Sequence, residues 1–146
     1  MKRSHLLFLT AAAAVACSTS LLPVGSTLAL GTWGAQNAGA LVSEQGAHVH
    51  IGCTYGDFPG LIALTRAGEV DAPGSYLLRA YPIAVGPTMP ARLTGRVDGD
   101  RFTLTVTVTD TITHQTTTLG PVELVHGKEP EMGPCPICRM PKAWTT

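Results

Sequence analysis

Apolar and polar residues alternate without a break along residues 101–109. Threonines fill one set of alternate positions after Arg101, and the other set is apolar: Phe102, Leu104, Val106 and Val108. Alternate residues of an extended chain point to opposite faces, so the pattern predicts an antiparallel strand with one buried face. Asp98-Gly99 directly before this segment is typical of a type I′ hairpin turn. Residues 92–97 are therefore the expected partner strand.

Short apolar segments punctuated by glycine and proline continue along the rest of the chain. Residues 38–43 and 47–53 are predicted to form a hairpin around Glu44-Gln45-Gly46. Further short strands are expected at residues 61–65, 75–80 and 121–125. No segment combines helical periodicity with capping residues. Seven or eight short strands joined mostly by tight turns predict an all-β fold, either an antiparallel up-and-down barrel or a sandwich.

The first residues predict export. Lys2 and Arg3 precede an uncharged apolar run at residues 6–16. This run is shorter than the roughly 20 residues that span a bilayer, so it is typical of a secretory signal. Two processing sites are possible. Ala14-Val15-Ala16-Cys17 resembles a bacterial lipobox, in which Cys17 becomes the acylated N-terminus, whereas Thr27-Leu28-Ala29 offers the small residues read by a signal peptidase for soluble proteins.

These features divide the chain into three segments. Residues 1–29 form the signal and a short linker, residues 30–127 the barrel or sandwich, and residues 128–146 a tail rich in proline and cysteine. The expected location is the periplasm or the outer membrane, held by lipid on Cys17, or the exterior as a soluble protein. The membrane is then the first expected partner.

Charge and motifs exclude several classes of function. The formal net charge is zero, only 14% of residues are charged, and no basic cluster occurs. Nucleic-acid binding relies on lysine and arginine to neutralise phosphates, so it is not expected. The chain lacks the Gly-x-Ser-x-Gly, His-Glu-x-x-His and phosphate-binding glycine motifs. We therefore expect a protein that is not an enzyme.

Gly31-Thr32-Trp33 opens the expected first strand. A Gly-x-Trp motif at this place resembles the calycins, the group of lipocalins and avidins, and implies an up-and-down barrel that carries a small apolar ligand. Avidins use several later tryptophans to bind biotin, and this chain has only Trp144 after Trp33. Biotin binding is therefore not expected. The chain also resembles small exported bacterial β-domains, which implies no activity.

Three cysteines follow residue 30: Cys53, Cys135 and Cys138. Disulfides are stable in an exported protein. Three cysteines cannot all pair. The preferred interpretation is a disulfide from Cys53 to either Cys135 or Cys138, which would fasten the tail to the barrel, and a Cys135–Cys138 bond is the alternative. The prolines around the Cys-x-x-Cys motif do not allow the helix that redox-active motifs require, so thiol exchange is not expected.

A metal site is the competing interpretation of the tail. "GPCPICRM" resembles the heavy-metal-binding modules of bacterial copper efflux proteins, with Cys135, Cys138 and Met140 at matching positions. Two thiolates and a thioether suit Cu(I), and thiolates with imidazoles suit zinc. His48 and His50 could complete such a site, because residues two apart on a strand share a face. Cys53 has the other parity and is expected on the core side with Val49 and Ile51, unless a bulge at Gly52 changes the register, so it is not expected to share an ion with the two histidines.

The sequence thus favours a non-enzymatic exported β-domain, anchored by lipid, with a binding or envelope-structural role. The first alternative is a periplasmic copper- or zinc-binding protein that uses the C-terminal Cys-x-x-Cys. The second is a calycin-like carrier of a small apolar ligand. No other cofactor is expected.

Overall fold

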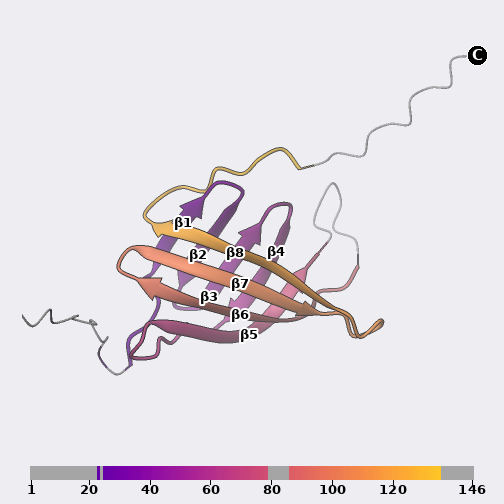
Figure 1. The fold of residues 1–146 in the computed structure, drawn as a ribbon, viewed down its shortest axis with the longest axis horizontal. Helices are drawn as coiled ribbons and strands as arrows, with labels where there is room; N and C mark the ends of the chain where they lie inside the picture. The colour runs from indigo at the N-terminus through magenta and orange to yellow at the C-terminus, as the bar shows by residue number, and fades with distance from the viewer. Residues whose placement is uncertain (1–22, 24, 79–85, 136–146) are drawn as a thin grey trace, which may run out of the picture.

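Eight strands follow one another around a closed barrel, each paired antiparallel with the next, and β1 pairs with β8 to complete it (Figure 1). The structure is a computed structural model that describes residues 23, 25–78 and 86–135. The strands are β1 (Gly31–Ala35), β2 (Ala38–Ser43), β3 (Gly46–Ile51), β4 (Thr54–Pro59), β5 (Glu69–Leu77), β6 (Met89–Asp98), β7 (Arg101–Thr109) and β8 (Thr116–His126). The expectation of an all-β up-and-down barrel is confirmed, and the sandwich alternative is not.

Large side chains fill the interior of the barrel. Strand β7 supplies the four apolar residues that the alternation predicted, each at most 1% exposed. The largest fully buried side chains come from seven of the eight strands and, in the case of Leu28, from the segment before β1: Trp33, Tyr76, Phe58, Phe102, Leu28, Leu93, Leu104, Leu124, Val49, Val106 and Val108. Small barrels are closed by side chains in this way, and the interior is a packed apolar core.

Packing against this core begins before residue 30. Leu28 is 1% exposed, and its amide donates a hydrogen bond to the carbonyl of Ile62 over 2.8 Å. The amide of Leu64 donates in turn to the carbonyl of Ser26 over 2.8 Å. The segment at residues 61–65, expected to be a strand, makes only isolated bridges here and lies beside the residues that precede β1. Its backbone is occupied by this short pairing, so it adds no strand to the barrel wall.

Two strands differ from the expectation. Residues 75–80 were expected to be a separate strand, but residues 75–77 are the end of the longer β5, and residues 79–85 lie outside the described part. Strand β4 was not expected at all. Its Gly56 lies against the next strand, and a Cβ atom there would overlap the ring of Tyr76. A glycine that weakens the strand pattern in the sequence is therefore the residue that lets β4 and β5 approach.

The hairpin between β3 and β4 also corrects a prediction. Ile51 pairs with Thr54, so the loop between the strands consists of Gly52 and Cys53 alone. Gly52 has a φ of 59°, a conformation that glycine adopts readily. The expected strand at 47–53 therefore ends two residues early. Cys53 lies in the turn at the barrel rim rather than on an inward face.

Candidate functional site

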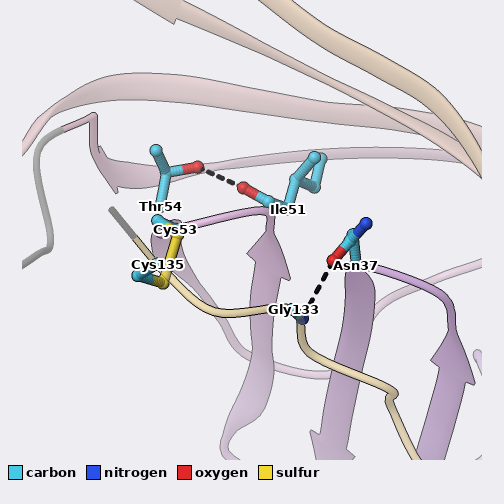
Figure 2. Close-up of a disulfide and its surroundings, with 6 residues drawn as sticks. All are labelled: Asn37, Ile51, Cys53, Thr54, Gly133 and Cys135. Carbon is cyan, nitrogen blue, oxygen red and sulfur yellow. Dashed lines mark hydrogen bonds between the residues drawn. A yellow bond between two sulfur atoms is a disulfide. The ribbon is translucent and has the colours of Figure 1, made fainter. Parts of the chain in front are cut away.

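A disulfide joins Cys53 in the β3–β4 turn to Cys135 in the tail (Figure 2). Their Cα atoms are 5.4 Å apart, and the two residues are separated by 82 positions in the chain. The expected link between Cys53 and a tail cysteine is confirmed, with Cys135 as the partner. Cys138 and Met140 lie outside the described residues, as does Cys17.

The tail reaches Cys135 by running back along the barrel. The chain turns at Gly127, which has a φ of 76°, and residues 127–135, here called the tail strap, then follow β1. The amide of Glu131 donates a hydrogen bond to the carbonyl of Ala35, and its carbonyl accepts one from the amide of Asn37, both over 3.0 Å. These bonds hold the strap on the β1–β2 hairpin.

Asn37 connects three segments at the rim. Its side-chain oxygen accepts a hydrogen bond from the amide of Gly133 over 2.9 Å (Figure 2). Its carbonyl accepts another from the amide of Gly52 over 2.7 Å. Asn37 has a φ of 58°, which asparagine tolerates better than most residues. The disulfide is therefore the covalent part of a junction between the β1–β2 turn, the β3–β4 turn and the strap.

Two glycines allow the strap to pack closely on the outer face of the β1–β2 hairpin. A Cβ atom at Gly34 would overlap the backbone of Lys128 and Glu129, and one at Gly39 would overlap the ring of Pro130. Because neither position has a side chain, the strap lies directly on the backbone of β1 and β2. No local motif marks Asn37, Gly34 or Gly39, so their roles were not predicted from the sequence.

A second group of polar side chains lies on the outer face of β3 and β4. His48 and His50 flank the fully buried Val49, so both imidazoles point away from the core. Their Nε2 atoms are 2.8 Å apart. The Nδ1 atom of His48 lies 2.6 Å from Oδ1 of Asp57, its cross-strand neighbour on β4. The register makes this cluster, because it pairs His48 with Asp57 and His50 with Tyr55.

The surroundings of His50 favour its neutral imidazole. Burial lowers the pKa of His50, and the nearby His48 lowers it further, while the charge of Asp57 acts in the opposite direction. The ring of Tyr55 packs near both imidazoles, with centroids 5.5 Å from His48 and 5.4 Å from His50. A hollow of about 230 Å³ opens beside His48 and Asp57. It also borders Leu41, which is 58% exposed.

Of the tail residues in the metal hypothesis, the structure describes Cys135 alone, and this residue is in a disulfide. The sulfur atoms of Cys53 and Cys135 are bonded to each other, so neither is a thiolate ligand in this state. The two histidines contact Asp57 and Tyr55 instead. Within the described ranges, no group of three or more His, Cys, Asp or Glu side chains is arranged to hold a metal ion.

Trp33 lies in the middle of β1 and points into the barrel core. It is 1% exposed, and its Nε1 atom donates a hydrogen bond to the carbonyl of Ala29 over 2.9 Å. Its ring meets the edge of Phe102 and lies 4.7 Å from the ring of His126. Trp33 is thus part of the packed core, and His126 has a structural contact with it.

The part of the chain that the structure describes holds no helix with the length and apolar character needed to cross a membrane. No protein-family model, curated protein or solved structure matches the chain.

Proposed function

We propose that this chain is a non-enzymatic binding domain that is exported and held at a membrane by an acyl chain on Cys17. The observation that carries the proposal is the disulfide between Cys53 and Cys135. Such bonds persist in oxidising compartments and are rare in the cytosol. The cross-link and the apolar leader at residues 6–16 are independent features, and both agree with export.

The packing of Leu28 favours Cys17 over Ala29 as the processing site. Leu28 is buried in the core, and Ala29 accepts the hydrogen bond of Trp33. Cleavage after Ala29 would remove both residues from the mature protein. Burying a leucine side chain contributes about 1.5–3 kcal/mol. Processing at Cys17 retains this contribution and leaves a short linker between the lipid and the barrel.

The filled interior favours binding at the outer surface. Four aromatic side chains, from Trp33, Phe58, Tyr76 and Phe102, occupy the space that a carrier would need for its ligand. A calycin-like carrier of an apolar molecule is therefore the weaker alternative. The outer face of β2 to β4, with its hollow and the exposed Leu41, is the more suitable place for a partner.

Binding of copper or zinc by Cys135 and Cys138 is an alternative function that applies only to the reduced chain. Both metals bind thiolates. In the oxidised protein the sulfur of Cys135 is committed to Cys53. A metal bound by the tail would therefore have to compete with the disulfide.

The test is fractionation of cells that express the full chain, combined with thiol alkylation and the intact mass of the mature protein. We expect an acylated N-terminus at Cys17, with Cys53 and Cys135 protected from alkylation until a reductant is added. Globomycin should make the precursor accumulate, and Cys17→Ala should release the protein from membranes. Cys138→Ser is the matched control and should change neither property.

Two results would contradict the proposal. A mature N-terminus at Leu30 in a soluble protein would reject the lipid anchor. Recovery of the wild-type protein in the cytoplasm with reactive Cys53 and Cys135 would reject export itself.

A further inference from the structure

The nature of the contact between His48 and His50 depends on which ring nitrogens carry a hydrogen. Asp57 accepts hydrogen bonds when ionised, so Nδ1 of His48, 2.6 Å from its carboxylate, carries a hydrogen. In neutral His48 the Nε2 atom then has only a lone pair. This lone pair faces Nε2 of His50 at 2.8 Å. The contact is therefore a hydrogen bond in which Nε2–H of His50 donates to this lone pair, and loss of that one hydrogen would leave two lone pairs that can bind one cation beside the line between the nitrogens.

The separation of the nitrogens fits a chelated metal ion. Zinc–imidazole bonds are about 2.0–2.1 Å long, so two such nitrogens lie about 2.9 Å apart at a right angle and about 3.3 Å apart at the tetrahedral angle. The observed 2.8 Å is within a few tenths of an ångström of this range. Both side chains project from the same strand with one residue between them, so the pair is positioned by the backbone of β3.

Asp57 occupies the place of an outer-sphere partner. Histidines that bind metals almost always donate their other ring hydrogen to a carboxylate, a carbonyl or water, which fixes the ring and raises its basicity. Asp57 does this for His48 from the neighbouring strand β4. Tyr55 packs against both imidazoles from the same strand and limits their movement.

We propose that His48 and His50 form a two-imidazole chelate for a divalent transition metal, with Asp57 as the residue that orients His48. Cu²⁺ should bind most tightly and Zn²⁺ less so, because sites with nitrogen ligands follow the Irving–Williams order. Two protein ligands leave coordination positions open, and the hollow beside His48 leaves room for water or a ligand from a partner. The site needs none of the tail cysteines and goes beyond the proposed function, since it does not depend on export or anchoring.

The experiment is calorimetric titration of Cu²⁺ and Zn²⁺ into the mature protein with its disulfide intact, at a pH above the usual histidine pKa of 6.5. We expect one equivalent per chain. His48→Ala and His50→Ala should each abolish the one-to-one isotherm. Asp57→Asn should weaken binding by about 10-fold to 100-fold, the usual effect of losing such a partner, and keep the stoichiometry. Electron paramagnetic resonance of the Cu²⁺ form should show coupling to imidazole nitrogen in the wild type and Asp57→Asn.

Controls separate this site from others in the chain. His114 is exposed on the β7–β8 loop, and His114→Ala should bind like the wild type. Cys138→Ser should also be unchanged, because the chelate does not use the tail. Circular dichroism should show that every variant remains folded, since both imidazoles lie outside the core. Wild-type binding by the His48→Ala/His50→Ala variant, loss of binding in Cys138→Ser, or absence of a one-to-one isotherm in the wild type would each overturn the proposal.

Discussion

Reduction of the Cys53–Cys135 disulfide should lower the free energy of unfolding by about 4.5 kcal/mol. The bond closes a loop between residues 82 positions apart, which contains β4 to β8. For a loop of this length, the chain-entropy relation states that the cross-link lowers the conformational entropy of the unfolded chain by about 15 cal/mol/K. This corresponds to about 4.5 kcal/mol at about 25 °C. Native domains are stable by about 5–15 kcal/mol, so the bond provides a large share of the total.

The native structure should change little on reduction. The strap keeps its backbone hydrogen bonds to Ala35 and Asn37, and Gly133 still bonds to the Asn37 side chain. The effect therefore lies mainly in the unfolded chain, which expands when the loop opens. The slope of the unfolding free energy against denaturant should rise accordingly, because this slope follows the surface exposed on unfolding.

Urea unfolding followed by circular dichroism, with and without reductant, measures both quantities. Cys138→Ser retains the bond and should lose about 4.5 kcal/mol on reduction, like the wild type. Cys135→Ser/Cys138→Ser has no tail thiol to pair with Cys53. Its free energy of unfolding should therefore equal that of the reduced wild type and should not change when reductant is added. A loss below about 1 kcal/mol on reduction, in a sample whose mass shows the bond, would refute the loop-entropy reasoning.

Two further predictions concern the core. Leu104→Ala should cost about 2–5 kcal/mol through a cavity in the filled interior. Thr105→Ala, one position along β7 with its side chain facing outward, should cost about 1 kcal/mol or less in the same urea assay. Equal costs would mean that the inward face is assigned wrongly. Burial raises the pKa of Tyr76 above its usual 10.0, against smaller opposing effects of its hydrogen bonds to Thr54 and the backbone. The folded chain then holds the phenol hydrogen more tightly than the unfolded chain, so stability is full below about pH 10 and falls as the pH rises through the folded pKa. Tyr76→Phe should flatten this alkaline fall in a series of unfolding curves, and an unchanged fall would reject the assignment.

The parts of the fold that were predictable are those with local signals. The alternation of β7 and the turn around Gln45 each lie within a few residues, and both agree with the structure. Strand β4 carries a glycine and an aspartate, which are depleted in strands, and β5 contains Pro73 and Gly74. A Cβ atom at Gly74 would overlap the ring of Phe58. Only the partner strand reveals that such a residue is required inside a strand rather than at a turn.

The candidate sites were predictable to the same extent. The spacing of His48 and His50 placed them on one face, and the oxidising compartment favoured a bond between Cys53 and the tail. Asp57 could not be assigned to the histidines, because that contact depends on the unexpected β4. The choice of Cys135 depends on the path of the strap, which is guided by Asn37 from 96 positions away. A contact between residues so far apart in the chain leaves no signal in a local sequence pattern.

The strap has a mechanical consequence for a barrel that is tethered at its N-terminus. A pulling force on the tether reaches Ser26 and Leu28 first and then β1, all of which lie outside the covalent loop closed by the disulfide. Strand β1 pairs with β8 at only two positions, Trp33↔His126 and Gly34↔Val125, so this seam is the place where peeling would start. The strap crosses the outer face of β1, and its far end is fastened covalently to the β3–β4 turn. The load on β1 is thereby shared with the strands of the loop, and the seam resists peeling although few of its own hydrogen bonds oppose the force.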